Sequence, residues 1–213
     1  MNDRLVNERY AMIATFVKAV TEDFSVRYST EHKEQTRQKL VQSSGSIAKQ
    51  GGFSATGVAG LMKAIGLTGG AFYNHFPSKD DLFTEIVRQE LSHSFINLRA
   101  QSGELTRDKL QRCLDQYLSL AHVDSPETGC AIPALGAEIA RADISVREEA
   151  EHWLKVLHHA WASTLGDEAL AWAILCQCVG ALLVARMLAT DDTRQTVLQA
   201  SRGFVQDALD RTL

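Results

Sequence analysis

The sequence predicts an all-α fold of about nine helices, and three observations lead to this prediction. Ala, Leu, Glu, Gln and Arg dominate the composition, and these residues favour helix. Only three prolines interrupt the 213 residues. The Asn-Gly and Asp-Gly pairs that are typical of β-hairpins do not occur in the sequence. The length allows one large or two small domains with a sizeable core.

Residues 1–32 show no clear helical pattern beyond the short stretch MIATFVKAV, and we treat them as an N-terminal extension. One hypothesis is that translation naturally starts at Val26, because alternative start codons can encode valine. N-terminal sequencing of the native protein tests this hypothesis.

Four helices are predicted after this extension. Glycines close the first two helices. Thr68 caps the third helix and Pro77 stops it, while Ser78 and Asp81 form a capping box that opens the fourth. The predicted ranges are Lys33–Gln50, Thr56–Ile65, Thr68–Phe76 and Ser78–Arg99.

Five more helices are predicted in the rest of the chain. Pro126 lies in the first turn of the second of these, and Pro133 interrupts the same segment. Ser145 and Glu148 form another capping box. The predicted ranges are Thr106–Ala121, Ser125–Arg141, Ser145–Leu165, Asp167–Leu188 and Thr193–Leu209.

The net charge of −4 hides an uneven distribution. Residues 33–80 carry six basic and two acidic side chains, whereas residues 81–213 carry twelve basic and nineteen acidic ones. One part of the chain therefore suits an anionic partner, and the alternative is a solvated basic face.

Neither the apolar residues nor the cysteines indicate an exported or membrane protein. The longest apolar run, Leu170–Ala185, has 16 residues, fewer than the roughly 20 that a membrane span needs. The four cysteines show neither a disulfide framework nor zinc-ligand spacing, and no secretory signal precedes them. We expect a cytoplasmic protein whose cysteines are reduced, and the simplest role for each cysteine is a small buried residue.

The stretch LTGGAFYNHFPSKDDLF has the composition of a nucleic-acid contact. Two short helices joined by a turn at residues 66–68 form a helix-turn-helix, whose second helix enters the major groove. Glycines at the start of that helix allow close approach to a phosphate or base. Four residues apart, Phe72 and Phe76 would pack inward, leaving Tyr73 and His75 outward. Lys79 could hold a phosphate at the next helix start.

These residues resemble the DNA-binding signature of the TetR family of transcriptional regulators. The resemblance rests on LMKAIGLTGGAFYNHFPSKDDLF and on TRQKLVQSSGSIAKQGGFSATGV, and it spans about Thr36 to Phe83. GCAIPALGAEIAR, residues 129–141, resembles a segment in the ligand domains of some members. The resemblance implies an N-terminal three-helix DNA-binding domain at residues 33–80. A C-terminal helical ligand-binding and dimerisation domain at residues 81–213 would follow.

The resemblance also implies roles for single residues. The residues expected to contact phosphates are Thr36, Arg37, Thr56 and Lys79. The residues expected to face the groove are Thr68, Gly69, Gly70, Tyr73, Asn74 and His75, with Tyr73 and His75 also near phosphates. Gly69 departs from the family, which often has Lys or Arg there, so a strong base or phosphate contact is missing.

The C-terminal part offers candidates for ligand binding and for self-association. Aromatic residues and one cysteine could line a ligand pocket, with burial in the core as the alternative. These residues are Phe95, Tyr117, Cys130, Trp153 and Trp161. The helices around residues 167–188 and 193–209 could form a four-helix dimer interface, with burial inside one protomer as the alternative.

The resemblance implies a ligand-responsive repressor that binds a palindromic operator as a homodimer and is released by a small-molecule inducer. An alternative is a thiol-based redox sensor that uses Cys130 or Cys113. An enzyme is not favoured, because the sequence contains no nucleophile–base constellation and no phosphate-binding loop. His152 and His159 share a helix face, but no third metal ligand is evident, so we expect neither a metal nor a cofactor.

Overall fold

The computed structural model describes residues 30–100 and 105–211, with the side chains of residues 94–100 left out. This part of the chain contains ten helical segments and no strand, which confirms the all-α prediction. The chain divides into two compact units, Met1–Leu40 and Val41–Leu213. Each unit is described by itself. The expected domain limits near residues 32 and 80 stay predictions, and the hypothesis about Val26 falls outside the described residues.

The first helix covers residues 30–51, and its residues 30–40 belong to the first unit. Thr36 donates its hydroxyl hydrogen bond to the carbonyl of His32 at 2.8 Å, as a residue inside a helix does. The helix already includes Thr30, three residues before the predicted start at Lys33, so Thr36 lies within it. Arg37, one residue later, is half-buried.

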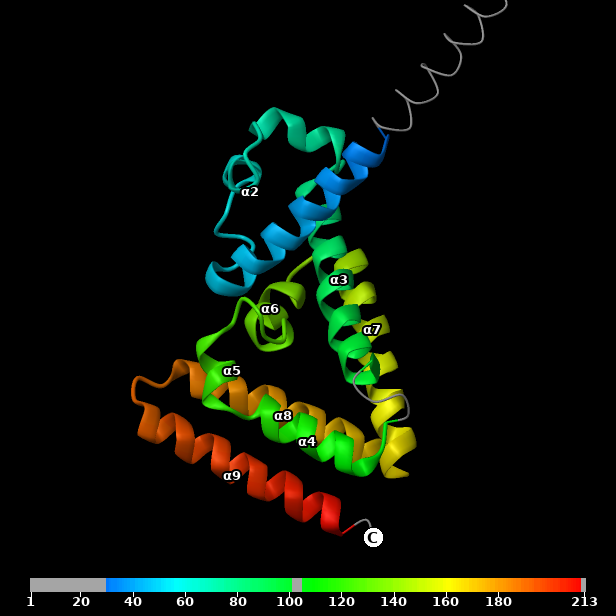
Figure 1. Cartoon of the computed structure of the whole chain (residues 1–213), viewed down its shortest axis with the longest axis vertical. Helices are drawn as coiled ribbons and strands as arrows, with labels where there is room; N and C mark the ends of the chain where they lie inside the picture. The colour runs from blue at the N-terminus through cyan, green and yellow to red at the C-terminus, as the bar shows by residue number, and fades with distance from the viewer. Residues whose placement is uncertain (1–29, 101–104, 212–213) are drawn as a thin grey trace, which may run out of the picture. The chain divides into compact units, whose positions relative to one another are not determined.

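The second unit continues from this helix through nine further helical segments. The first three are α2 (Val58–Ala64), the 3₁₀ helix η1 (Gly69–Asn74) and α3 (Lys79–Ala100). Next come α4 (Arg107–Tyr117), α5 (Leu120–Asp124) and α6 (Ile132–Ile139). The last three are α7 (Ile144–Leu165), α8 (Glu168–Met187) and α9 (Asp191–Asp210). Figure 1 shows α3 alongside α7 and α8 alongside α9.

Three predicted helix starts or ends are wrong, each for a local reason. The helix predicted to reach Ala121 ends at Tyr117, because Ser119 accepts from the N–H of His122 and caps the separate helix α5. The helix predicted from Ser125 begins only at Ile132. Pro133 stands in its first turn, where the missing N–H breaks no helical hydrogen bond.

The third error concerns α7. Its N-cap is Asp143 and the helix already contains Ile144, so Ser145 and Glu148 do not form the predicted capping box. The predicted end of this helix at Leu165 is confirmed, and Gly166 follows it with φ 72°. This left-handed conformation strains any residue with a side chain, so glycine suits the position.

The helix α8 lies in the core of the second unit. Its buried face includes Ile174, Leu182 and Ala185, which belong to one cluster with Leu114 of α4 and Leu198 of α9. By length and composition, α8 is also the one helix of the described residues that could cross a membrane. Part of this apolar sequence is buried against α7 and α9.

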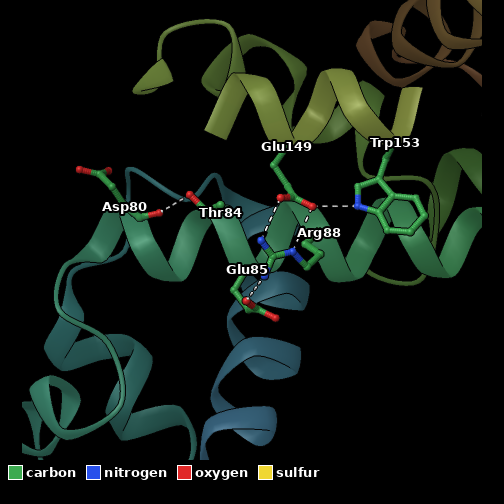
Figure 2. A network of polar contacts seen from close by, with 6 residues as sticks. All are labelled: Asp80, Thr84, Glu85, Arg88, Glu149 and Trp153. Atoms are coloured by element: carbon green, nitrogen blue, oxygen red, sulfur yellow. Dashed lines mark hydrogen bonds and ion pairs between the residues drawn. The ribbon is translucent and has the colours of Figure 1, made fainter. Parts of the chain in front are cut away.

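A polar network holds α3 against α7 (Figure 2). The guanidinium of Arg88 donates to both carboxylate oxygens of Glu149, from Nε at 3.0 Å and from Nη2 at 2.9 Å. The carboxylate also accepts from the indole N–H of Trp153 at 2.9 Å. The hydrogen bond from Arg88 is the main reason that the pKa of Glu149 lies below its ordinary value. This two-point contact fixes the register of the two helices.

The starts of α7 and α8 offer a matched test of helix capping. Asp167 accepts from the N–H of Leu170 at 3.0 Å, whereas the side chain of Asp143 caps no N–H of α7. We expect Asp167→Ala to lower the free energy of unfolding by about 1 kcal/mol, and Asp143→Ala to cost only the weaker charge–dipole effect. Urea denaturation measures both variants. Equal losses would show that the cap bond contributes nothing.

Candidate nucleic-acid interface and ligand cleft

The turn between α2 and η1 has the hydrogen bonds of a Schellman motif. The N–H of Gly66 donates to the carbonyl of Lys63 at 3.0 Å, and the N–H of Leu67 donates to that of Met62 at 2.9 Å. Gly66 has φ 76°, which a residue with a side chain rarely adopts. The predicted helix-turn-helix connection thus follows from one glycine and two backbone bonds.

The segment η1 presents a buried aromatic face and an exposed polar one. Phe72 and Phe76 are fully buried, as predicted, and their ring centroids lie 6.0 Å apart. Tyr73 is 68% exposed and Asn74 is also exposed. His75, predicted to point outward, is half-buried and its Nδ1 is covered, so it is only partly exposed. The reason is that η1 ends at Asn74 and the chain turns at His75.

Thr68 occupies the N-cap position of η1 and is exposed, but its side chain caps no N–H, so the predicted side-chain cap is wrong. The short 3₁₀ geometry replaces the regular helical turn that such a cap would serve. Thr56 lies two residues before α2 and is half-buried.

The two glycines at the start of η1 have different surroundings. A Cβ built on Gly69 would lie 3.4 Å from the Cα of Ala59, so this glycine faces α2. A Cβ on Gly70 would meet nothing within 4 Å. The open surface that we expected at both glycines exists only at Gly70. A long basic side chain at position 69 would have to run past α2 to reach solvent.

Phe53, in the turn before α2, is held by three different contacts. Its carbonyl accepts from the ammonium of Lys79 at 2.8 Å, and its N–H donates to Glu138 of α6 at 2.7 Å. Its ring stacks on Phe83 of α3 with 4.4 Å between centroids. Lys79, expected at a phosphate, therefore already has a partner within this unit. The ammonium also lies 4.5 Å from the centre of the Phe53 ring.

Glu138 connects α6 to this same turn. Its second carboxylate oxygen accepts from the N–H of Ser54 at 3.0 Å. Burial acts to raise the pKa of Glu138, but the hydrogen bonds from Ser54 and Phe53 outweigh it and leave the pKa below the ordinary value. The carboxylate therefore remains charged and holds the turn at neutral pH.

A buried ion pair joins the first helix to α3. The ammonium of Lys49 lies 2.7 Å from a carboxylate oxygen of Glu90, and the side chain of Lys49 is 5% exposed. The same ammonium donates to the carbonyl of Gly129 at 3.3 Å. The helices approach closely at this point, since a Cβ on Gly45 would lie 2.7 Å from Oε1 of Glu90. Lys49 thus touches both α3 and the turn before α6.

A cleft of about 740 Å³ opens beside this ion pair. The residues that line it come from the first helix, from α3 to α5, from the turn before α6, and from α7 and α8. Three of the predicted ligand residues, Tyr117, Cys130 and Trp161, lie in its wall, together with Cys113. Trp153 does not line it and instead bonds to Glu149. The side chain of Phe95 is outside the described residues.

His122 organises the polar side of the cleft. The N–H of Cys130 donates to Nε2 of His122 at 3.0 Å, so the ring proton belongs on Nδ1, which lies 2.8 Å from the carbonyl of Tyr117. Burial lowers the pKa of His122, so the ring is neutral at pH 7. Gly129 is required here, because a Cβ on it would lie 2.5 Å from the imidazole.

Sequence reasoning missed Lys49, His122 and Glu138. The partners of Lys49 and Glu138 lie far away in the chain, since Glu90 is 41 positions from Lys49 and Phe53 is 85 positions from Glu138. His122 contacts Tyr117 and Cys130, which are 5 and 8 positions away and thus not at a regular helical spacing. No local spacing rule pairs residues at such separations.

The helix-turn-helix geometry agrees with a comparison of sequences. The pattern of the family described as "Bacterial regulatory proteins, tetR family" matches residues 46–86, from within the first helix to α3. Residues 46–86 thus carry the N-terminal DNA-binding pattern of the TetR family. The match covers the Schellman turn, η1 and the Phe53 turn, which are the parts of the TetR-family signature described above.

The named relatives that this chain matches are transcriptional regulators. It is 40% identical over 70 residues to HTH-type transcriptional regulator AcrR of Shigella flexneri, covering 33% of this chain and 32% of AcrR. It is 28% identical over 113 residues to HTH-type transcriptional repressor NemR of Escherichia coli (strain K12), covering 52% of this chain and 56% of NemR. The matched part thus spans between about a third and about half of these relatives.

Solved structures show the same fold over a longer part of the chain. The reduced form of E. coli NemR superposes with a TM-score of 0.70 at 20% identity, covering 81% of this chain and 96% of NemR. A regulator described as a TetR/AcrR family member gives a TM-score of 0.68 at 22% identity, covering 83% of this chain and 99% of that one. These likenesses extend the fold assignment into the C-terminal helices.

Glu138 can be tested through its two backbone donors. We expect Glu138→Gln to lower the free energy of unfolding by about 1–3 kcal/mol, because one N–H loses its acceptor. Because the folded-state pKa is lowered, this stabilisation is complete above the unfolded-state pKa and disappears as pH falls through the folded-state value. Urea denaturation across an acidic pH series measures it.

The control is Glu148→Gln on α7, where the side chain is exposed. We expect it to change stability by less than about 0.5 kcal/mol at any pH of the series. A loss for Glu138→Gln that stayed constant down to pH values well below ordinary carboxylate pKa values would contradict the assigned role of the charge.

Proposed function

We propose that this chain is a ligand-responsive transcriptional repressor that binds a palindromic DNA operator as a homodimer and is released by a small-molecule inducer. The observation that carries this proposal is the position of Lys49. It lines the cleft and lies on the helix that leads into the helix-turn-helix. A molecule in the cleft would therefore contact the part of the chain that carries the DNA-binding element. A DNA-binding role also favours the cytoplasm.

The exposed side of η1 is the proposed base-reading surface. Tyr73 and Asn74 are exposed and carry hydrogen-bonding groups, and Gly70 leaves room for close approach of DNA. Thr68 is also exposed there. Thr36, Arg37, Thr56, Gly69, His75 and Lys79 remain proposed contacts. The role of Lys79 would then be double, because its ammonium also holds the Phe53 carbonyl.

The inducer would act by shifting a population. A ligand changes DNA affinity only when it binds the released conformation more tightly than the DNA-bound one. In the cleft, it would press on the turn at Gly129 and Cys130, which Lys49 and His122 hold. Movement of this turn would change the support of the first helix at Lys49.

Exposed apolar side chains on α8 and α9 support the proposed dimer. Leu183, Val184 and Met187 are exposed on α8, and Phe204 is 56% exposed on α9. These two helices pack against each other (Figure 1), and a second copy that docked on them would bury these exposed side chains. A symmetric pair of such surfaces would build a four-helix interface.

The redox alternative has less support. Burial raises the pKa of Cys130 and of Cys113, so both thiols are protonated at neutral pH. The thiolate is the form that reacts with oxidants, which makes these two cysteines slow sensors. One of the superposing structures is the reduced form of NemR, but that description belongs to NemR.

DNA binding can be tested with fluorescence anisotropy. We expect the purified protein to prefer DNA from upstream of its own gene over a scrambled duplex, and to keep this preference at higher salt. We expect Tyr73→Ala to weaken specific binding about tenfold, because the exposed ring would lose its contact with the groove.

Circular dichroism should show an unchanged fold for Tyr73→Ala, since the side chain is largely outside the core. The matched control is Ile144→Ala, another exposed apolar residue, on α7. Unchanged affinity for Tyr73→Ala would remove η1 from the proposed interface. Equal, salt-sensitive binding to both duplexes would mean that only phosphates are contacted.

Self-association can be tested with a charge in the proposed interface. We expect Met187→Glu with Phe204→Glu to convert the dimer into a monomer, because four carboxylates would have to be buried per dimer. Sedimentation equilibrium measures the mass. Ile144→Glu, on an apolar residue that is 58% exposed on α7, is the control and should remain dimeric. A charged double variant that stays dimeric would place the interface elsewhere.

A further inference from the structure

The walls of the cleft are mainly apolar. Helix α7 contributes Leu157 and Trp161, one turn apart, and α8 contributes Leu175 and Val179 with the same spacing. Leu114 of α4 adds to this surface. Together these side chains offer an apolar surface large enough for a molecule with two or more rings, since the cleft has about 740 Å³.

The lysine in the cleft wall is already neutralised. The ammonium of Lys49 lies 2.7 Å from Glu90 and also donates to Gly129. An anionic ligand could take this ammonium only by displacing Glu90, which would leave a carboxylate unpaired in a half-buried position. Glu127 also lines the cleft, and its negative charge repels anions further.

The polar groups beside this ion pair are uncharged. Nε2 of His122 accepts from the N–H of Cys130, so a second ring proton would break that hydrogen bond. Burial raises the pKa of Tyr117 and of Cys130, and both stay protonated at neutral pH. A charged ligand would find no opposite charge among these three residues.

We propose that the cleft binds uncharged, largely apolar molecules with about two or three fused or linked rings and discriminates against anions of the same shape. This inference rests on the proposed function for its relevance to induction. It adds the chemical class of the ligand. Specificity comes from the apolar walls, from the closed Lys49–Glu90 pair and from the carboxylate of Glu127.

Two fluorescent probes test the proposal because they share one skeleton. N-phenyl-1-naphthylamine is uncharged, and 8-anilino-1-naphthalenesulfonate adds a sulfonate to the same rings. Titration of the full-length protein with each probe at neutral pH gives two dissociation constants. We expect the uncharged probe to bind at least about tenfold more tightly, because the sulfonate must be desolvated while the ammonium of Lys49 in the cleft wall is already paired with Glu90.

Substitutions in the cleft walls test whether the probe binds in the cleft. Val179→Phe and Leu157→Phe add bulk to two different walls, and each should weaken binding of the uncharged probe at least about fivefold. Ser163→Phe adds a ring to an exposed position of α7 outside the cleft and should have no effect. Thermal unfolding of each variant shows whether it is folded, and two cleft variants allow for the loss of one.

Equal or tighter binding of the sulfonate would overturn the proposal. Binding of the uncharged probe that both folded cleft variants leave unchanged would also overturn it. DNA affinity is measured in the same samples. Discrimination against the sulfonate without any effect of the probe on DNA binding would support the ligand class and count against induction through the cleft.

Discussion

Three contacts at the Phe53 turn hold the helix-turn-helix in place against α3 and α6. Lys79 holds its carbonyl, Glu138 holds its N–H, and Phe83 stacks on its ring. These partners come from the start of α3, from α6 and from the body of α3. Because the turn leads directly into α2, its position sets where α2 and η1 begin. Each contact contributes little free energy alone, but together the three contacts fix the position of the Phe53 backbone.

The ion pair between Lys49 and Glu90 has a different role. A buried pair of this kind contributes little net stability, because desolvation offsets most of the attraction, but removing one partner alone costs several kcal/mol, roughly 3–5. The pair therefore specifies how the first helix packs against α3. The second contact of Lys49, to the carbonyl of Gly129, brings the turn before α6 into that arrangement. A displacement of the Gly129 turn changes the surroundings of the Lys49 ammonium, which is costly to leave unpaired. Movement at the cleft is therefore strongly coupled to the position of the first helix.

The parts of the fold that could be predicted are those with local causes. Gly66 ends α2, Asp167 caps α8, and Phe72 with Phe76 faces inward because residues four apart share a helix face. The predicted helix from Ser125 was wrong because Pro133 fits a helix start as well as an interruption. Lys49 and Glu138 escaped prediction since their partners are brought to them only by the tertiary fold. His122 escaped it because Tyr117 and Cys130 are not at a regular helical spacing from it.

Intramolecular contacts also change which signature residues are available for DNA. Sequence reasoning regarded Gly69 and Lys79 as surface features, yet Gly69 faces Ala59 and Lys79 binds the Phe53 carbonyl. A lysine in the first turn of a helix opposes the helix dipole, and the carbonyl with the ring of Phe53 offsets that cost. No phosphate is needed to explain Lys79. In the proposed interface, base recognition would therefore depend on Gly70, Tyr73 and Asn74, which carry no positive charge. Such a surface depends on shape and hydrogen bonds, so its specificity should respond weakly to salt compared with that of a lysine- or arginine-led helix.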